Sequence, residues 1–196
     1  FVEPAQFDSY EAALAGHFYH DRLVCGVKGA AAQVEFIEKA SPKCSHIVIC
    51  DDNITGFVKQ VSKKETRPLE KLELSKLIET AALEMCKNDA HIWSLNPSTN
   101  PYFMEEKIDT GLGLIYGPLF GFHVLHDDAR YSQYGDIRDD VERTLRYYDL
   151  DKKIVRFMNY AVKKSAEPGT FVVLKGGISS NFGSQAEYEA EKAKNM

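Results

Sequence analysis

The chain has 196 residues, of which 44% are hydrophobic and 27% are charged, so it is long enough to bury a core without disulfide or metal support. Its 24 Lys and Arg against 29 Asp and Glu give a net charge of −5, which argues against a protein coated with basic residues for indiscriminate nucleic-acid binding. Its 4 Cys form no CxxC pair, and no uncharged apolar run reaches the roughly 20 residues that cross a membrane. We therefore expect one domain over residues 1–196, with reduced, buried thiols, in the cytoplasm and away from membranes.

Short apolar runs alternate with helical patterns over the first half of the chain, which is typical of a parallel sheet flanked by helices. The run SHIVICDD over 45–52 is the clearest strand, because consecutive apolar residues of the kind found in buried strands lead into two carboxylates. The opening FVEP resembles the end of a strand, so we expect the first strand of the fold to be missing. The other elements expected in this half are a strand over 22–27 and helices over 7–14 and 29–40.

The second half of the chain mixes both kinds of element. The segment over 59–76 is rich in Lys and Arg and contains a proline, so we expect a mobile connection that leads into a helix over 70–87. The Gly-rich apolar segment over 110–126 predicts a pair of strands with closely approaching backbones. We further expect strands over 91–97 and 154–164, a helix over 138–148, a turn at 168–169 and a helical tail. Together these elements predict an α/β fold with a mixed, mainly parallel sheet flanked by helices.

The strand over 45–52 leads into Asp51, Asp52 and Asn53, at the kind of strand end where open α/β sheets bind ligands. Adjacent carboxylates repel each other, and a cation or hydrogen-bond donors must offset that repulsion. A divalent metal that holds a diphosphate would supply the offset, because Mg²⁺ and Mn²⁺ bind carboxylate and phosphate oxygens together. An acidic turn that faces solvent and caps a helix explains the three residues equally well.

A second acidic group, GDIRDDVER over 135–143, lies at a predicted helix start. Carboxylates are common there because they complement the helix dipole. The same position could project Asp140 into the cleft as a general base, and spacing alone does not choose between the two explanations. Lys28 and Gly29 open an earlier helix, where backbone N–H groups can bind an anion or simply turn the chain.

Positive charge is unevenly distributed along the chain. Residues 143–164 carry seven Lys or Arg and two Asp, so a basic stretch lies within a chain of net negative charge. Such asymmetry favours a polyanionic partner. We therefore expect a salt-dependent face for nucleic acid that includes Arg143, Arg146 and Lys153.

Several segments occur in an order that matches a known family. They are FVEPAQFDSYEAAL, VCGVKGAAAQVEFI, HIVICDDNITG, YGDIRDDVERTLRYY, KIVRFMNYAVKK and a final KGG. In this order the chain resembles the GT-A type glycosyltransferases associated with TET/JBP dioxygenases, a largely phage-encoded group similar to the base J glucosyltransferase. The resemblance covers nearly the whole chain. Its specific part is the combination of KGxAxQ, the acidic strand end and the acidic helix start.

The resemblance implies a GT-A-like (Rossmann-like) domain that moves a sugar from a nucleotide-sugar donor, such as a UDP-sugar, to a hydroxymethylated pyrimidine in DNA, with inversion. It implies bound Mn²⁺ or Mg²⁺, a functional link to a dioxygenase or hydroxymethylase, and a bacterial host cell as the location. The implied site residues fall into three groups. The metal and the donor diphosphate are bound by Asp51, Asp52 and Asn53, and the donor is also contacted by Lys28, Gly29 and Gln33. The base is Asp140, with Asp139 beside it, and close approach of the acceptor is allowed by Gly117 and Gly121.

Two features leave other interpretations open. Asn53 stands where many relatives have a third Asp, so the metal site loses a charge. The segments ICDDNITG and GDIRDD also resemble the first and last motifs of haloacid-dehalogenase-type phosphatases, which would make Asp51 a phosphoryl-accepting nucleophile. That resemblance is weaker, because Asn53 replaces the acid that protonates the leaving group and the motif lies well inside the chain. A catalytically silent nucleic-acid-binding relative is the third interpretation.

Overall fold

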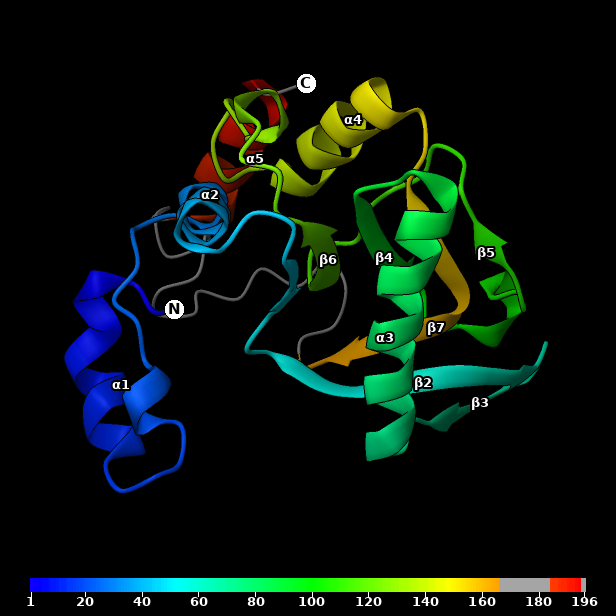
Figure 1. Ribbon diagram of the computed structural model, residues 1–196, viewed down its shortest axis with the longest axis horizontal. Helices are drawn as coiled ribbons and strands as arrows, with labels where there is room; N and C mark the ends of the chain where they lie inside the picture. Colours follow the sequence, from blue (N-terminus) through cyan, green and yellow to red (C-terminus); the bar gives the residue numbers. More distant parts are fainter. Residues whose placement is uncertain (166–183, 195–196) are drawn as a thin grey trace.

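The computed structural model describes residues 1–165 and 184–194, which form a mixed α/β fold around a curled sheet (Figure 1). Six of its seven strands follow the order β1-β6-β4-β7-β2-β3, and β5 pairs with β7. The strands are β1 (His46–Cys50), β2 (Ile54–Ser62), β3 (Glu65–Pro68), β4 (Ile92–Asn96), β5 (Ile108–Asp109), β6 (Leu119–His123) and β7 (Val155–Lys164). The α-helices are α1 (Phe7–Leu14), α2 (Ala30–Ala40), α3 (Lys71–Asn88), α4 (Asp139–Asp151) and α5 (Gln185–Lys194).

Most neighbouring strands run antiparallel. Among the described pairings only β4 and β7 are parallel, and the other five pairs are antiparallel. The expectation of a mainly parallel sheet is therefore wrong. Parallel neighbours need long crossover connections, whereas β2 and β3 are joined through residues 63–64 alone and form a hairpin. Because β6 lies antiparallel between β1 and β4, the strands β1, β4 and β7 nevertheless point in the same direction.

Three segments differ from the sequence-based expectation. The basic stretch over 59–76 is an ordered hairpin and not a mobile connection, because β2 pairs with β3 and Arg67 donates to Glu73 of α3 at 2.7 Å. Residues 22–27 form no strand and contribute only an isolated bridge between Val2 and Cys25. Within 110–126 the structure has one strand, β6, where a pair was expected.

The remaining elements agree with the expectation to within a few residues. The helices predicted over 7–14, 29–40, 70–87 and 138–148 and the helical tail are confirmed, as are the strands predicted over 45–52, 91–97 and 154–164. The turn expected at 168–169 and the KGG segment at 175–177 lie outside the described residues.

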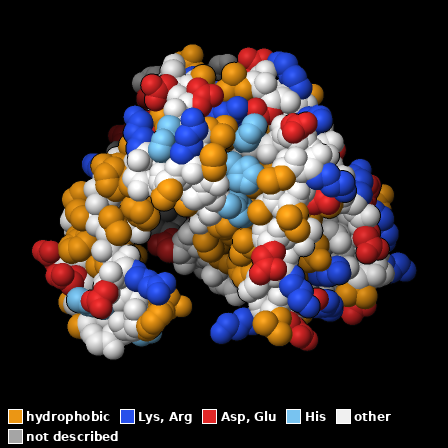
Figure 2. All heavy atoms as spheres, viewed as in Figure 1, with side chains coloured by type: hydrophobic (Ala, Val, Ile, Leu, Met, Phe, Trp, Pro, Cys, Tyr) orange, Lys and Arg blue, Asp and Glu red, His pale blue; other side chains and the backbone are white. Residues whose placement is uncertain are grey.

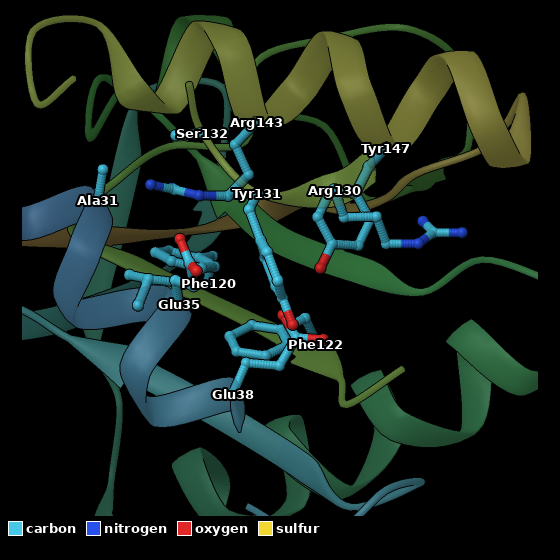
Figure 3. A pocket seen from close by; sticks show the side chains of 11 residues that line it. Ala31, Glu35, Glu38, Phe120, Phe122, Arg130, Tyr131, Ser132, Arg143 and Tyr147 are labelled. Atoms are coloured by element: carbon cyan, nitrogen blue, oxygen red, sulfur yellow. The ribbon is translucent and has the colours of Figure 1, made fainter. Parts of the chain in front are cut away.

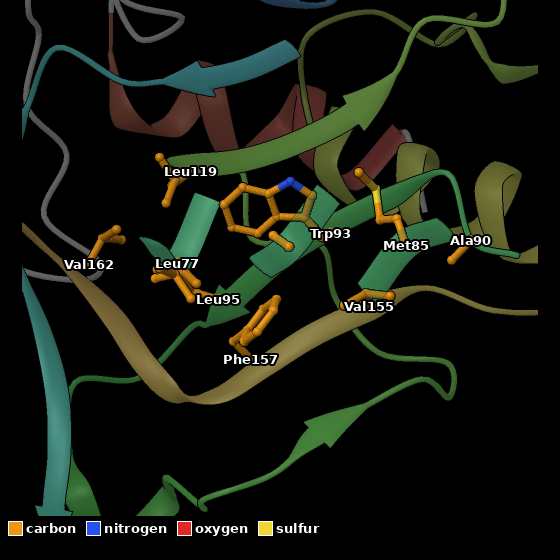
Figure 4. Packing of buried hydrophobic residues seen from close by; sticks show 10 residues of the cluster. Leu77, Met85, Ala90, Trp93, Leu95, Leu119, Val155, Phe157 and Val162 are labelled. Atoms are coloured by element: carbon orange, nitrogen blue, oxygen red, sulfur yellow. The ribbon is translucent and has the colours of Figure 1, made fainter. Parts of the chain in front are cut away.

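One hydrophobic cluster fills the space between the sheet and α3 (Figure 4). Trp93 of β4 is fully buried at its centre and meets Phe157 of β7 edge to face, with 6.1 Å between the ring centroids. Helix α3 contributes Leu77, Ala81 and Met85, whose spacing of four residues lines one face of a helix. Truncating a fully buried aromatic ring costs about 3–5 kcal/mol, so this cluster fixes β4 and β7 side by side beneath α3.

A second cluster covers the other face of the sheet. Ile92 belongs to it although its neighbour Trp93 belongs to the first, because successive side chains of a strand point to opposite faces. Phe120 and Phe122 of β6 stack here with 6.1 Å between their ring centroids. Tyr147 of α4 belongs to the same cluster, and α2 adds one partly buried residue. This packing places α2 and α4 on the same side of the sheet.

The N-terminal part of the chain stands apart from both clusters. No residue of α1 is buried. Figure 1 shows this part at one end of the molecule, and Figure 2 shows a notch between it and the body on the face that is drawn. The N-terminal segment therefore contributes little to the core that positions the other elements.

The cysteines correct one expectation. Cys25, Cys44, Cys50 and Cys86 are free thiols, but all four are exposed, so the prediction of buried thiols is wrong. Among the described helices, none combines the length and the apolar character needed to span a membrane.

Three histidines line up across one edge of the sheet, at the start of β1, the end of β6 and just before β4. The ring centroids of His46 and His123 are 5.9 Å apart, and those of His91 and His123 are 6.2 Å apart. Figure 2 shows histidine side chains gathered near the middle of one face. Trp93 Nε1 donates to His46 Nε2 at 2.8 Å, which requires that nitrogen to be unprotonated. Burial lowers the pKa of His46 and His123, and in each case a neighbouring histidine lowers it further.

We expect the free energy of unfolding to fall as the pH drops below about 6.5, the ordinary pKa of histidine. A lowered pKa means that the folded protein binds fewer protons than the unfolded chain there, so acid favours unfolding by at most about 1.4 kcal/mol per pH unit for each histidine. Urea denaturation from neutral to mildly acidic pH measures this decline. It should be shallower in His123→Gln than in the control His17→Gln, on the exposed N-terminal part; equal slopes would contradict the assignment.

Candidate functional site

Two backbone hydrogen bonds hold the turn between β1 and β2. Asp51 donates its N–H to the carbonyl of Pro118, just before β6, at 2.9 Å. Asn53 accepts, through its carbonyl, the N–H of Ser165, just after β7, also at 2.9 Å. The acidic strand end predicted from the sequence therefore lies where the end of β1, the loop before β6 and the end of β7 meet.

Helix α4 begins at the same place. A methyl group on Gly117 would lie 3.6 Å from Cβ of Asp140, so the loop before β6 contacts the first turn of α4. Asp139 in that turn acts electrostatically on Asp51. The preceding residue, Arg138, has φ of 63°, and α4 begins directly after it. Both aspartates therefore lie in the first turn of the helix, where the helix dipole favours anions. The two acidic groups of the sequence thus converge, although about ninety residues separate them.

The converging carboxylates carry more charge than their neighbours neutralise. Burial raises the pKa of Asp51; Lys164 lowers it, with Nζ 3.9 Å from Asp51 Oδ2, while Asp52 and Asp139 raise it further. Burial also raises the pKa of Asp139, against the lowering effect of Arg143. Perturbed carboxylates of this kind are typical of ligand sites and also occur in structural ion-pair networks.

Arg143 is a buried support of Asp139 and not a surface residue. It is 5% exposed, its guanidinium is bonded to the Asp139 carboxylate, and it lies 4.0 Å from the centre of the Phe120 ring. Figure 3 shows it reaching from α4 into a small pocket that α2, α4 and the sheet enclose. Arg143 is therefore not available to DNA, which corrects its predicted role in an acceptor face.

The contiguous basic face expected over 143–164 is not formed. Arg146 donates to Glu142 at 2.7 Å and to the carbonyl of Ala129 at 3.2 Å. Arg156 is bonded to Asp109 of β5. The residues that look like one basic stretch in the sequence lie on different elements, and nearby carboxylates neutralise much of their charge.

The start of α2 already holds a carboxylate of the chain itself. Asp136 Oδ1 accepts the N–H of Ala31 at 2.8 Å. Gly29 has φ of 97°, and a methyl group there would lie 3.1 Å from Asp136 Oδ2, so both the backbone angle and the contact favour glycine. Lys28 is exposed beside it. The helix start binds an anion, as its chemistry predicts, but in this conformation the anion is Asp136.

Two further residues implied by the resemblance have structural tasks. Gln33 accepts the N–H of Val27 through its side-chain oxygen at 2.7 Å and so holds the loop before α2. Gly121 is buried in β6, where the indole of Trp93 occupies the space that a side chain would need and His46 Nε2 would lie 2.9 Å from a methyl group. In this conformation both positions are therefore engaged by the chain itself, and neither is open to a nucleotide-sugar or to a DNA acceptor.

Three residues of the site were not found from the sequence. Burial raises the pKa of Tyr116, and Asp51 and Asp140 raise it further, so its phenol lies near both acidic groups. The other two are Lys164 and Asp136, described above. The Gly-rich segment around Tyr116 was a usable signal, because close backbone approach marks ligand sites. Lys164 was noted only as part of the basic stretch over 143–164, since strand pairing and not sequence position brings it to Asp51.

The chemistry of the turn fits a hard cation that shares its ligands with a substrate. Asn53 Oδ1 is buried and accepts no hydrogen bond from any described residue, and the Asp51 side chain, 42% exposed, has only the Lys164 ammonium at 3.9 Å as an ion-pair partner among the described residues. Oxygen donors of these kinds suit Mg²⁺ or Mn²⁺. Asp52 is exposed, and the described residues contain no group of three or more His, Cys, Asp or Glu side chains placed to hold a metal by themselves. A cation here would therefore take further ligands from phosphate or water.

Comparison with known proteins identifies no relative: no family model, curated protein or solved structure matches the chain. The functional interpretation accordingly depends on the geometry of the site and on the motifs of the sequence.

We expect Asp51→Asn to raise the free energy of unfolding at neutral pH, because burial and neighbouring carboxylates disfavour the charge of Asp51. The gain should stay below about 1 kcal/mol, since the side chain is 42% exposed. A raised pKa makes the penalty strongest when the group is ionised, so the gain should shrink as the pH falls towards 3.8, the ordinary pKa of Asp. Urea titrations at neutral and acidic pH test this, with Glu106→Gln, which removes an exposed carboxylate on another part of the chain, as control. A loss of stability in Asp51→Asn at neutral pH would overturn the electrostatic assignment.

Proposed function

We propose that the chain is a GT-A-like glycosyltransferase that moves a sugar from a nucleotide-sugar donor to the hydroxyl of a hydroxymethylated pyrimidine in DNA. The observation that carries this proposal is the convergence of the two acidic groups. Asp51 at the end of β1 and Asp139 at the start of α4 interact, and Gly117 connects Asp140 to the same site. A donor-binding acid and an acceptor-side base need this proximity, because both act on one sugar carbon.

The direction of the strands supports the same proposal. β1, β4 and β7 run one way with β6 reversed between β1 and β4. Asp51 directly follows β1 and Lys164 is the last residue of β7, so both lie at the carboxyl ends of strands that run in the same direction. Ligands of α/β sheets bind at such ends. Together with the order of motifs along the chain, this favours a Rossmann-like, GT-A-type site over an incidental acidic turn.

The proposed chemistry assigns the base to Asp140. Its Oδ1 accepts the N–H of Val141 at 2.9 Å, and no described residue donates to its second oxygen, which can receive the proton of the acceptor hydroxyl. As that hydroxyl oxygen bonds to the sugar C1, the bond from C1 to the diphosphate breaks and its electron pair moves to the phosphate oxygen. Asp139 is already bonded to Arg143 and is the poorer base.

The turn of residues 51–53 would hold Mn²⁺ or Mg²⁺ through Asp51 and the orphaned oxygen of Asn53. The ion would neutralise charge on the departing diphosphate. Asp51 also orients the site without the ion, because its backbone bond to Pro118 fixes the loop that contacts Asp140.

The acceptor and the cellular setting follow from the resemblance. The acceptor is DNA with a modified pyrimidine, which a dioxygenase or hydroxymethylase prepares. The donor is a UDP-sugar, and the setting is the cytoplasm of a bacterial host. Chemistry on a paired base requires it to leave the stack, so the site would receive a flipped nucleotide.

The proposal is tested by incubating the protein with UDP-glucose and DNA that contains hydroxymethylcytosine or hydroxymethyluracil, with and without Mn²⁺. Nucleoside mass spectrometry should show a hexose added to the modified base. A panel of other nucleotide sugars covers other donors, and transfer from none of them would defeat the proposal. Hydrolysis of p-nitrophenyl phosphate that disappears in Asp51→Asn would instead favour the phosphatase.

The two aspartates of α4 should separate by phenotype. Asp140→Asn should lower transfer by roughly 10²–10⁴-fold, the usual contribution of a general base, while stability and donor binding are kept. Asp139→Asn removes the counter-charge of the buried Arg143 and should lower the free energy of unfolding more than Asp140→Asn does, although relief of the burial penalty on the Asp139 charge offsets part of the loss. Paired transfer and urea measurements on both variants check this division. Full activity in Asp140→Asn would remove it as the base.

A further inference from the structure

The end of β7 places one lysine beside the acidic turn. Lys164 Nζ lies 3.9 Å from Asp51 Oδ2, and its side chain is 29% exposed. This separation is beyond a normal hydrogen bond, so the ammonium compensates the carboxylate without being fixed to it. Within the described part of the chain, the Lys164 ammonium makes no hydrogen bond and can turn its three N–H donors to a ligand.

The backbone of Lys164 is fixed to the acidic turn on both sides. Lys164 pairs with Ile54 of β2, and the next residue, Ser165, donates its N–H to the carbonyl of Asn53 at 2.9 Å. The ladder shifts register between Ile54 and Gly56, the kind of irregularity that re-aims side chains next to sites. Lys163 pairs with Gly56, is exposed and points away, because successive strand residues face opposite sides.

We infer that Lys164 is a substrate-contacting residue that binds the diphosphate of the donor and neutralises it as it leaves; this inference rests on the proposed glycosyltransferase function. The electron pair of the broken C1–O bond passes to the diphosphate oxygen. Lys164 receives that developing charge through hydrogen bonds and keeps its own protons, and the hydroxyl proton goes to Asp140. Lysine suits this task because it is a compact point charge that binds phosphate.

The charges around Asp51 favour Lys164 over the other cation near it. Lys164 and Arg143 both act on Asp51, and Lys164 acts more strongly. Arg143 is 5% exposed and bonded to Asp139, and its Nη1, which has no hydrogen-bond partner among the described residues, is buried, so the guanidinium is far less accessible to a ligand than the Lys164 ammonium. Lys164 is the accessible cation of the pair. A bound metal would attract its partner, the Asp51 carboxylate, and leave the ammonium available to the diphosphate.

The test measures nucleoside diphosphate binding by calorimetry in the presence of Mn²⁺, with UDP, GDP, ADP, CDP and dTDP as probes and UMP as the monophosphate comparison. Lys164→Met keeps the apolar stem and removes the charge. It should weaken binding of the preferred diphosphate roughly ten- to hundredfold, the loss expected for charge-assisted hydrogen bonds, with a smaller effect on the monophosphate. Lys164→Arg should restore most of the affinity, and Lys163→Met is the matched control on the same strand.

The outcomes separate this inference from the proposed function. If the unaltered protein binds a nucleoside diphosphate and Lys164→Met binds it equally well, the inference is overturned and the transferase proposal stands. If the unaltered protein binds none of the diphosphates, both are overturned. Thermal melts of each variant keep a folding defect from being mistaken for lost contact, and rescue by Lys164→Arg supports the contact directly.

Discussion

The turn of residues 51–53 is tied to two distant parts of the chain, and the candidate site depends on that constraint. One bond joins Asp51 to the carbonyl of Pro118, and the other joins the carbonyl of Asn53 to Ser165. Backbone bonds of this kind fix the turn without using its side chains. The carboxylate of Asp51 and the amide oxygen of Asn53 therefore remain available for chemistry, while the loop before β6 and the end of β7 are held against them.

Local pattern predicted the elements of this site better than their arrangement. The apolar run before Asp51 and the acidic start of α4 are properties of neighbouring residues, and both elements were found where expected. The strand directions were not correctly predicted. The antiparallel placement of β6 and the β2–β3 hairpin depend on packing and on short connections, which the spacing of apolar residues does not show. The place of Lys164 in the site was not predicted for the same reason, because strand register brings it beside Asp51.

The net charge of −5 hid a local balance of opposite charges. Counting residues along 143–164 suggested a surface for a polyanion, yet Arg143 is buried against Asp139 and Phe120, and Arg146 is bonded to Glu142. A linear count treats every charge as solvated, whereas folding pairs most of the basic residues in this stretch with a carboxylate that the helix or sheet brings near. The proposed DNA acceptor would therefore need contacts other than one basic stripe along residues 143–164.

The two ends of strand β1 serve opposite demands. At the start of β1, His46 pairs with His123 and accepts the indole N–H of Trp93. The packing there is so close that no side chain fits at Gly121. At its end Asp51 is a carboxylate whose pKa burial raises, an arrangement that lowers stability. Asp51 directly follows the five residues of the strand, so only about 17 Å separates it from His46. The closely packed end can thus hold the acidic end in place although its carboxylates repel one another, because strand pairing fixes the backbone that leads to them.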